Sequence, residues 1–492
     1  MLNIRLCFSM LTLGLQVQNW VKLQFKMASR MYTVFMLVGL LSVPKVIADI
    51  GSFWHVTDFH YDSTVFTSQD SCTSPVADIE QKPYGDYLCD SPWSLINSSV
   101  HAMKQIEPNA DFILWTGDNA PHIDESKDSS ENIINIISNL TSILMDVFPN
   151  TKVYAAHGNH DYFPHNQLPP HENEIYHAAA NMWQRWHRDS TANTTLRKGG
   201  YYMVSIKQGL VAVVLNTNLY YNSNKVTADI SDPAGQFQWF DQVLDQAAQN
   251  GNKAYVIAHI PTGMYEEGDS MIRPQFNKKL NDLIIKHKNT IAAMFYGHHH
   301  TDTFKLWYDQ GEPVAFGLVA PSVTPWRAIV PAINLSTPAH NPGIRLLRYD
   351  RLTYQLKDIW QYYLELPDAN DKSKAQWKLE YKFSEAYGVQ EITSTSLAQL
   401  VSDLEKKTDV FMKYFRYNIV SAKGESVPTS CDTNCQRLYI CSIKEVDDDR
   451  HSKCVKPVSS NGFRPVAFIS WDFYFLFTVM IVSGCVSKNH FL

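Results

Sequence analysis

The sequence predicts an α/β fold in which short buried strands alternate with helices. From Ser52 to about Leu366, runs rich in Val, Ile, Leu, Phe and Tyr alternate with helix-length stretches. Of the 492 residues, 45% are hydrophobic and 12% aromatic, so the chain can bury a large core and is neither disordered nor fibrous. Its net charge of −6, with scattered basic residues, argues against a dedicated nucleic-acid surface.

Strands are expected wherever a short apolar or β-branched run ends at a polar or glycine-containing segment. The first seven candidates are Phe53–Thr57, Phe112–Thr116, Lys152–Ala156, Tyr201–Ile206, Val211–Asn216, Ala254–Ala258 and Ile291–Tyr296. Three later candidates, Val314–Val319, Ile344–Tyr349 and Tyr354–Leu366, have a more antiparallel character and predict a second sheet.

Helices are expected between these strands, at Trp93–Ile106, Glu131–Asp146, Glu172–His187, Gly235–Asn250 and Gln275–His287. This alternation favours helices layered on a largely buried sheet. Further along, the pattern changes to one long helix, Ser396–Tyr417, followed by a cysteine-rich segment. We therefore expect a main domain over residues 49–390 and a small helical subdomain over residues 391–460, pinned by disulfides.

The N-terminal segment has the composition of a secretion signal. Residues 1–48 contain basic residues and no acidic one, and Met31–Val43 is an apolar run directly after Arg30. A run this short does not span a bilayer, which needs about 20 residues, so a signal peptide cut near Ala48 is expected. Met27 is an alternative start, and a buried helix is the alternative to a signal.

The C-terminal segment has the layout of a signal for a GPI anchor. Phe473–Val486 is an apolar run near the end of the chain, and a cluster of small residues that includes Ser460 precedes it. We expect attachment at Ser460 and removal of residues 461–492. A single membrane-spanning helix over Val466–Val486 is the alternative, although it would place Asp472 in hydrocarbon. A chain with neither anchor is the third alternative.

Six cysteines remain when both end segments are excluded: Cys72, Cys89, Cys431, Cys435, Cys441 and Cys454. Secretion makes disulfides their expected state, and many pairings are open. Proximity in the sequence favours Cys72–Cys89, Cys431–Cys435 and Cys441–Cys454, and a zinc site that begins at Cys431 is the alternative. Four glycosylation sequons fit the same secretory route: Asn97, Asn139, Asn193 and Asn334.

Residues that can ligate metals follow five of the expected strands. They stand as Asp58-Phe59-His60, Gly117-Asp118, Asn159-His160-Asp161, His259 and His298-His299-His300. Loops beyond the carboxyl ends of strands converge on one crevice in an α/β sheet, so these segments are expected to share a site. Carboxylate, imidazole and amide groups together suit Zn, Mn or Fe. Each segment alone is weak evidence, and it is their order that predicts a metal centre.

In that order the motifs resemble those of the binuclear metallophosphoesterase superfamily, and more closely those of the acid sphingomyelinase-like phosphodiesterases. The closer resemblance continues through Ala320–Trp326 and Asn341–Gly343 to the cysteine-rich end, and the C-terminal tail is similar to that of the GPI-anchored b-type member. The resemblance implies a calcineurin-like β-sandwich: two mixed sheets flanked by helices, with a small helical, disulfide-pinned C-terminal subdomain. It also implies two metal ions between the sheet ends, and zinc is expected.

The resemblance assigns a role to each motif residue. The implied ligands of the two metal ions are Asp58, His60 and His300 for one, and Asn159, His259 and His298 for the other, with Asp118 bridging them. A hydroxide that bridges the metals would attack phosphorus in line. The implied catalytic residues are His160, oriented by Asp161 and assisting the leaving group, and His122, contacting the phosphate. Tyr162, Trp326 and Asn341 are candidates for the substrate pocket, with a place in the core as the alternative.

One departure from the family bears on the substrate. Acid sphingomyelinase has a saposin-like domain before its catalytic domain, and here only Asp49–Gly51 separate the expected cleavage site from the first strand. We therefore expect small phosphodiesters or nucleotide phosphoanhydrides as substrates, with no nucleic-acid polymer as a partner. A sphingomyelin phosphodiesterase that releases ceramide and phosphocholine is the alternative. A surface-anchored binding or signalling protein with weak catalysis is the second alternative.

The location follows from the two ends of the chain. We expect a protein of the secretory pathway that is held by a lipid anchor at the outer leaflet of the plasma membrane. A secreted or lysosomal protein is the alternative.

Overall fold

The computed structural model describes residues 20, 22–27, 49–266, 268, 270–330, 335–424 and 426–456. Residues 1–49 and 50–492 form two separate compact units, and all elements named below belong to the second. The apolar run Met31–Val43, the tail after Ser460 and the sequon at Asn334 lie outside the described residues. Within the described part, no helix combines the length and the apolar character that crossing a bilayer would need.

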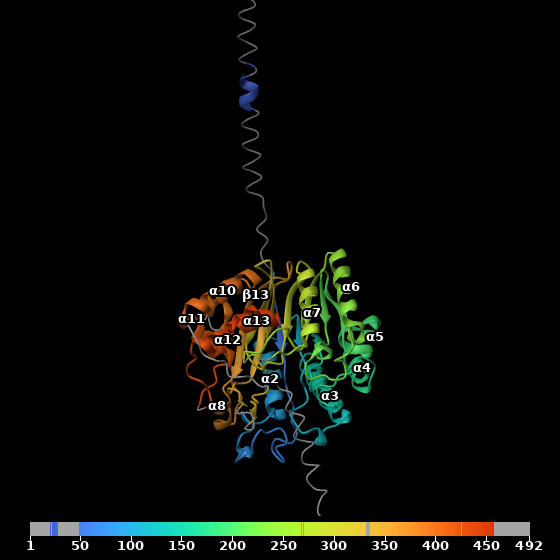
Figure 1. Ribbon diagram of the computed structural model, residues 1–492, viewed down its shortest axis with the longest axis vertical. Coiled ribbons are helices and arrows are strands. Elements are labelled where there is room, and N and C mark those ends of the chain that lie inside the picture. Colours follow the sequence, from blue (N-terminus) through green and yellow to red (C-terminus); the bar gives the residue numbers. More distant parts are fainter. Residues whose placement is uncertain are drawn as a thin grey trace, which may run out of the picture. The chain divides into compact units, whose positions relative to one another are not determined.

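Two six-stranded sheets of mixed direction form the frame of the second unit (Figure 1). The strands are β1 (Ile50–Val56), β2 (Phe112–Trp115), β3 (Lys152–Ala155), β4 (Tyr202–Lys207), β5 (Leu210–Val214), β6 (Lys253–Ile257), β7 (Ile291–Tyr296), β8 (Thr303–Asp309), β9 (Glu312–Val319), β12 (Gly343–Asp350), β13 (Leu356–Leu364) and β14 (Trp377–Lys382). A separate ribbon pairs β10 (Ile329–Val330) with β11 (Leu335–Ser336).

Sheet 1 has the order β14-β13-β12-β1-β2-β3, and sheet 2 has the order β4-β5-β6-β7-β9-β8. In sheet 1, β1 is parallel to β2 and antiparallel to β12. In sheet 2, the inner strands β5, β6, β7 and β9 run parallel, and the edge strands β4 and β8 run antiparallel to them. The predicted sandwich of two mixed sheets is therefore confirmed.

The two sheets pack face to face through aromatic side chains. The ring of Phe53 on β1 lies 5.8 Å from that of Tyr255 on β6 and 5.7 Å from that of Phe295 on β7, between ring centroids. All three side chains are fully buried in one core cluster. Both faces of the inner strands are covered, one by the other sheet and one by helices. Their sequences are therefore nearly continuous runs of apolar residues.

Helices flank the sandwich. They are α2 (Trp93–Ile106), α3 (Ser130–Val147), α4 (Glu174–His187), α5 (Ser190–Gly199), α6 (Gln236–Gln249), α7 (Pro274–Lys286), α8 (Leu366–Asp371), α9 (Phe383–Tyr387), α10 (Ser394–Lys406), α11 (Thr408–Asn418), α12 (Thr433–Lys444) and α13 (Asp448–Cys454). Helix α4 packs on β3, α6 packs on β6, and α7 packs on β8 and β9. The C-terminal helices α10 and α12 also pack on β8.

Helix α3 illustrates why these segments are helical. The side chain of Ser129 caps its first turn by accepting a hydrogen bond from the main-chain N–H of Asn132. Its buried residues recur at helical spacing, and they are Ile133, Ile136, Ile137, Leu140, Thr141, Ile143 and Leu144. One face therefore meets the core while the other faces solvent.

Several sequence predictions need correction. The later strands do not form a sheet of their own: β9 completes sheet 2, whereas β12 and β13 join sheet 1 beside β1. The long helix predicted over Ser396–Tyr417 is two helices, because Lys407 adopts an extended backbone with φ −122° and ψ 103° between α10 and α11. The strands β8, β10, β11 and β14 and the helices α5, α8, α9, α12 and α13 were not predicted.

All three disulfides favoured by proximity are present, namely Cys72–Cys89, Cys431–Cys435 and Cys441–Cys454. The last of these joins α12 to α13. The alternative of a zinc site at Cys431 and Cys435 is wrong, because their sulfur atoms are bonded to each other. Such bonds are typical of proteins that fold in an oxidising compartment.

A buried lysine joins sheet 2 to the C-terminal helices. Lys305 lies on β8 with no exposed surface, and its ammonium donates hydrogen bonds to the carbonyl oxygens of Met264, at 2.5 Å, and Ser442, at 2.9 Å. Burial lowers the pKa of Lys305 to about 8, although the nearby Glu266 carboxylate acts in the opposite direction. The folded protein therefore loses this proton at a lower pH than the unfolded chain does.

This shift predicts that the free energy of unfolding rises between pH 8 and about pH 10. Above pH 8 the folded state has released the Lys305 proton while the unfolded chain retains it, so the Lys305 contribution grows towards about 3 kcal/mol. Below pH 8 both states are protonated and the contribution is absent. Guanidinium unfolding at a series of pH values measures the effect. Lys305→Met should flatten the rise, and an unchanged slope in that variant would contradict the assignment.

Candidate active site

The predicted ligands lie in loops at the ends of strands from both sheets. The loops after β1 and β2 are joined by a hydrogen bond from the N–H of Asp58 to the carbonyl oxygen of Gly117, at 2.9 Å. The loops after β6 and β7 are joined in the same way, with the N–H of Gly297 donating to the carbonyl oxygen of His259 at 3.0 Å. Because neighbouring parallel strands end at one edge, residues distant in sequence meet there.

The structure brings these ligands together in two groups. Asp58, His60 and His300 form one group, and Asp118, His259 and His298 form the other, with the ligand atoms in each group within 4.8 Å of one another. Asp118 lies between the groups, because its Oδ2 is 3.1 Å from Nε2 of His259 and 3.5 Å from Nε2 of His60. Asn159 joins the second group, with its Oδ1 at 3.1 Å from Nε2 of His259.

The pattern of donors and acceptors shows that these residues fit bound cations. Nδ1 of His60 faces the carbonyl oxygen of Ala120 at 2.8 Å, and Nδ1 of His259 faces that of Thr116 at 2.7 Å. Each Nδ1 therefore donates to a carbonyl oxygen, which leaves Nε2 as the ring nitrogen that can bind a cation. The two Nε2 atoms lie near Nε2 of His300, at 3.2 Å from that of His60, and near the oxygens of Asp118 and Asn159. This set of ligand atoms suits a bound metal ion.

The backbone at the site is held in an unfavourable conformation. Five of the seven predicted ligands have positive φ, which is uncommon for residues other than glycine: Asp58 (51°), His60 (40°), Asp118 (55°), His298 (72°) and His300 (60°). Each such residue costs about 1–3 kcal/mol and persists where the surroundings enforce it. Strain concentrated on the ligands is typical of a functional site.

Two glycines allow the loops to approach one another. A Cβ atom at Gly158 would lie 2.0 Å from Oδ1 of Asp118, and one at Gly297 would lie 2.6 Å from Oδ2 of Asp58. Real Cβ atoms do not come this close to other heavy atoms, so each glycine leaves space for a ligand carboxylate.

The electrostatics of the site favour charged carboxylates and neutral imidazoles. Burial raises the pKa of Asp58 and Asp118, but the surrounding histidines outweigh it and hold both values well below the usual range. Burial lowers the pKa of His60 and His298, which keeps both rings neutral, as metal ligands must be. His259 and His300 differ. Burial lowers the pKa of both rings, but the Asp118 carboxylate raises that of His259 more, to about 9, and the Asp58 carboxylate likewise raises that of His300 above its usual value.

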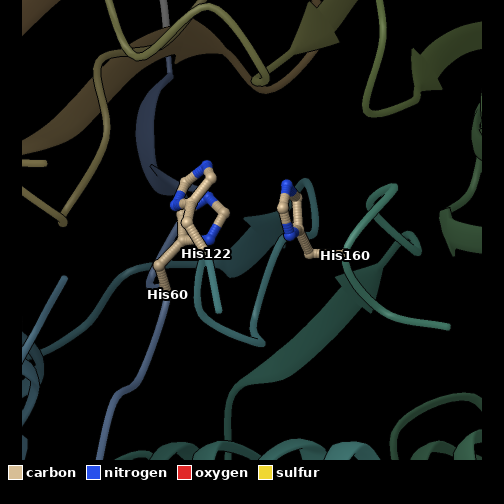
Figure 2. Close-up of side chains that lie close together, drawn as sticks. All are labelled: His60, His122 and His160. Carbon is tan, nitrogen blue, oxygen red and sulfur yellow. The ribbon is translucent and has the colours of Figure 1, made fainter. Parts of the chain in front are cut away.

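His122 and His160 lie beside His60 of the first metal group (Figure 2). The ring of His122 lies 4.2 Å from that of His60 and 4.4 Å from that of His160, between centroids. The N–H of His160 donates to Oδ1 of Asp118 at 2.9 Å, and its Nδ1 is buried with no hydrogen-bond partner among the described residues. Two imidazoles beside the metal groups can therefore contact a substrate.

The prediction that Asp161 orients His160 is wrong. The Asp161 carboxylate accepts hydrogen bonds from the main-chain N–H groups of Asp118, at 3.1 Å, Asn119, at 2.7 Å, and Gly158, at 2.8 Å. Burial and the nearby Asp118 charge raise the pKa of Asp161 to about 7. Asp161 thus holds the loops after β2 and β3 together and supports Asp118.

The three substrate-pocket candidates fall in different places. Asn341 belongs to the core: its Oδ1 accepts from the Tyr87 hydroxyl at 2.8 Å and its Nδ2 donates to the carbonyl oxygen of Val420 at 3.1 Å. Trp326 belongs to the site, because its ring stacks on that of His122 with centroids 3.8 Å apart and planes 3° from parallel. Tyr162 is partly buried.

Sequence reasoning missed Asp90. Its carboxylate accepts from the main-chain N–H of His122 at 2.6 Å and lies 3.1 Å from Nδ1 of the same residue. Asp90 directly follows Cys89, and this position next to a disulfide is the sequence feature that could have suggested a fixed functional residue.

The glycosylation candidates that the structure describes, Asn97, Asn139 and Asn193, lie on helices α2, α3 and α5. The side chains of Asn97 and Asn139 are exposed, and that of Asn193 is partly buried.

Comparison with known proteins places these observations in a family. Residues 51–302 match the calcineurin-like phosphoesterases, and residues 312–461 match the C-terminal region of acid sphingomyelin phosphodiesterases. Human acid sphingomyelinase-like phosphodiesterase 3b is 41% identical over 432 residues, which cover 85% of this chain and 92% of that protein. Human cyclic GMP-AMP phosphodiesterase SMPDL3A is 40% identical over 420 residues, covering 83% and 90%. Sphingomyelinase phosphodiesterase C of Dictyostelium discoideum is 29% identical over 457 residues, covering 88% and 99%.

Proposed function

The chain belongs to the acid sphingomyelinase-like phosphodiesterases of the calcineurin-like phosphoesterase superfamily, and from this membership we propose that it cleaves small phosphodiesters or nucleotide phosphoanhydrides with two zinc ions. The family makes it a metal-binding phosphodiester hydrolase. The observation that carries the finer proposal is the position of Asp118, whose carboxylate lies within 3.5 Å of both His60 and His259. A carboxylate shared between two ligand groups suits a pair of cations.

The proposed ligands are Asp58, His60 and His300 in the first group and Asn159, His259 and His298 in the second, with Asp118 shared. Two zinc ions held there, when bound, would polarise the phosphoryl group and lower the pKa of a water molecule for in-line attack. Asn159 contributes an oxygen without a negative charge, which leaves the loaded site more positive towards an anionic substrate.

This chain's histidines contact the reacting phosphate. The main-chain N–H of His160 is held by its hydrogen bond to Asp118, which places the residue beside the crevice. Burial lowers the pKa of His160 well below its usual range, so the neutral ring assists the leaving oxygen by donating a hydrogen bond to it. His122 lies beside His160 and can donate a hydrogen bond to a phosphoryl oxygen. Both residues therefore act on the phosphoryl group from the side of the first metal group.

A substrate panel tests this proposal. Zinc-loaded protein spanning residues 49–460 is assayed with bis(p-nitrophenyl) phosphate, cyclic GMP-AMP, ATP and sphingomyelin in detergent micelles. Hydrolysis of the nucleotide substrates, with little release of phosphocholine, is expected. The second candidate, sphingomyelin hydrolysis, is favoured by the match of residues 312–461 to the acid sphingomyelin phosphodiesterases. Turnover of sphingomyelin without turnover of any nucleotide would establish it instead.

The proposed location is the outer face of the plasma membrane. The three disulfides and the relatives support an oxidising, extracellular environment. A lipid anchor at Ser460, after removal of residues 1–48 and 461–492, would then tether the enzyme, with glycans at Asn97, Asn139, Asn193 and Asn334. Treatment of expressing cells with phosphatidylinositol-specific phospholipase C should release the protein, and retention on the cells would contradict the anchor.

A further inference from the structure

The imidazole of His122 is fixed by residues that lie outside the metal-binding motifs. Asp90 approaches it from one side: Oδ2 accepts from the main-chain N–H of His122 at 2.6 Å, and both carboxylate oxygens lie 3.1–3.2 Å from Nδ1. A proton on Nδ1 therefore points at the carboxylate. This leaves Nε2 as the ring nitrogen that a ligand in the crevice can reach.

The Asp90 carboxylate is itself held in place. It is completely buried, and Oδ1 also accepts a hydrogen bond from the hydroxyl of Thr324 at 3.0 Å. Both carboxylate oxygens thus have partners, two of which come from His122 and one from the segment before Trp326. A buried carboxylate is costly unless it is satisfied in this way, so its position indicates a specific task.

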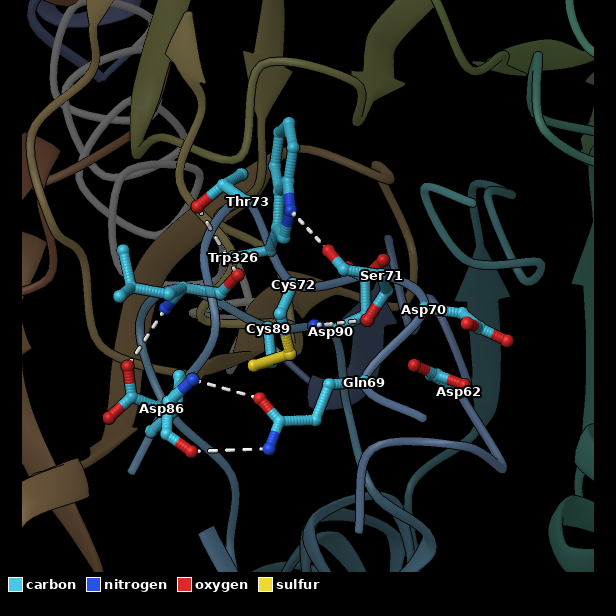
Figure 3. The surroundings of a disulfide bond; sticks show 12 residues. Asp62, Gln69, Asp70, Ser71, Cys72, Thr73, Asp86, Cys89, Asp90 and Trp326 are labelled. Carbon is cyan, nitrogen blue, oxygen red and sulfur yellow. Dashed lines mark hydrogen bonds between the residues drawn. A yellow bond between two sulfur atoms is a disulfide. The ribbon is translucent and has the colours of Figure 1, made fainter. Parts of the chain in front are cut away.

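The disulfide Cys72–Cys89 supports this arrangement (Figure 3). Ser71 precedes one of its cysteines and Asp90 follows the other, and the N–H of Asp90 donates to the Ser71 hydroxyl at 3.0 Å. The disulfide therefore fixes the two ends of the loop 71–90 next to each other. Both Ser71 and Asp90 contact residues of the site.

Trp326 completes the enclosure of His122. Its indole N–H donates to the carbonyl oxygen of Ser71 at 3.1 Å, and its ring stacks on the His122 imidazole at 3.8 Å between centroids. The opposite face of the imidazole stacks against His60, at 4.2 Å with planes 26° apart. Asp90, at one end of the loop, thus contacts the edge of the His122 imidazole. Ser71, at the other end, binds the indole of Trp326, which covers a face of that imidazole.

We propose that Asp90 is a positioning residue that acts through His122. The loop 71–90, closed by the disulfide Cys72–Cys89, holds both Asp90 and the indole of Trp326 in position beside the metal groups. The inference rests on the proposed function, since it gives His122 a phosphoryl group to contact. Without Asp90 the imidazole can rotate and exchange its tautomer, so Nε2 is correctly placed for less of the time. Partners of this kind change activity by about 10- to 100-fold when they are removed.

A double-mutant cycle separates this role from a merely structural one. The variants are Asp90→Asn, His122→Ala and the combination of both, assayed with bis(p-nitrophenyl) phosphate after zinc loading. Asp90→Asn alone should lower kcat by about 10- to 100-fold and leave the zinc content unchanged, because Asp90 contacts no predicted ligand side chain among the described hydrogen bonds. In the His122→Ala background it should lower kcat by less than about twofold, because the group it positions is gone.

The matched control is Asp86→Asn. Asp86 lies in the same loop, pairs with Lys82 at 2.6 Å and caps the N–H of Leu88 at 3.0 Å. This variant should retain activity. In its background, Asp90→Asn and His122→Ala should show the same coupling as in the wild type. If Asp90→Asn loses zinc, or lowers kcat as strongly with His122→Ala as without it, the positioning role is overturned.

A binding measurement keeps this test independent of the substrate. Inorganic phosphate is titrated calorimetrically into the same zinc-loaded variants, and Asp90→Asn should weaken phosphate binding only where His122 is present. The paired variant Cys72→Ser with Cys89→Ser should weaken it to a similar degree, without a further loss when Asp90→Asn is added. If the wild type binds phosphate but hydrolyses no substrate of the panel, the proposed function fails. The phosphate affinities of the four variants of the cycle still test the role of Asp90. If the effects of Asp90→Asn and His122→Ala on phosphate binding were additive, the positioning role of Asp90 would be contradicted while the proposed function would stand.

Discussion

Replacement of Asp118 by asparagine is expected to lower phosphodiester hydrolysis by about 10³-fold or more, beyond the 10- to 100-fold typical of residues that only support ligands. Asp118 carries the negative charge between the two groups, at 3.1 Å from Nε2 of His259 and 3.5 Å from that of His60. An amide keeps the shape but removes the charge that holds two cations near each other. Zinc content, measured by mass spectrometry on the purified variant, should fall together with kcat.

The control for this variant is another buried carboxylate, in the segment that follows β1. Asp62 is 3% exposed, and its Oδ1 accepts from the main-chain N–H and the hydroxyl of Thr64. Asp62→Asn should keep two zinc ions per chain and most of the activity. Full activity in Asp118→Asn, or a loss of zinc in both variants, would falsify the assignment of Asp118 as the shared ligand.

Gly158→Ala is expected to be nearly as damaging, although it adds a single methyl group. The added Cβ would lie 2.0 Å from Oδ1 of Asp118 and 2.2 Å from its main-chain nitrogen, so the loop after β2 must move. Overpacking of this kind costs about 1–3 kcal/mol of stability, and the displacement of Asp118 should lower kcat by about 100-fold or more. Thermal unfolding and steady-state kinetics measure the two effects separately.

Gly251→Ala provides the matched comparison. Gly251 has φ 68°, so alanine is strained there, but its Cβ would meet no described atom within 4 Å. This variant should lose up to about 1 kcal/mol of stability and retain its kcat. If Gly158→Ala behaved in the same way, the close approach of the loops after β2 and β3 would have no role in placing Asp118.

The candidate metal ligands could be located from the sequence because each follows a strand with two covered faces. Such strands are continuous apolar runs, so their ends, and the polar residues that come next, stand out clearly. The strand β8 did not stand out, because the charged Lys305 lies within it, and the groups that compensate this charge come from distant segments. The edge strand β14 alternates charged and apolar residues and was missed for a similar reason.

The supporting residues of the site could not be predicted, because their contacts leave no local pattern. Asp161 directly follows the motif histidine His160, yet the hydrogen bonds that identify its role come from main-chain N–H groups, which leave no mark in the sequence. Asp90 lies 32 positions before His122, and the disulfide loop that brings them together has no periodicity to read. The break at Lys407 lies in a stretch without proline or glycine, so neither of these usual signals of a helix end marks it in the sequence.

The arrangement of sheet 1 sets an order for biosynthesis. Strand β1 is the first of the fold, but one of its two neighbours is β12, so that Ile50 is paired with Asp350. In a chain emerging from the ribosome, β1 can pair with β2 early, but its other edge lacks its partner until hundreds of further residues have been made, and pairings of such long range form slowly. Asp58 and His60 directly follow that strand. The candidate ligands therefore cannot come together until His300 and β12, which reaches Asp350, have both been made.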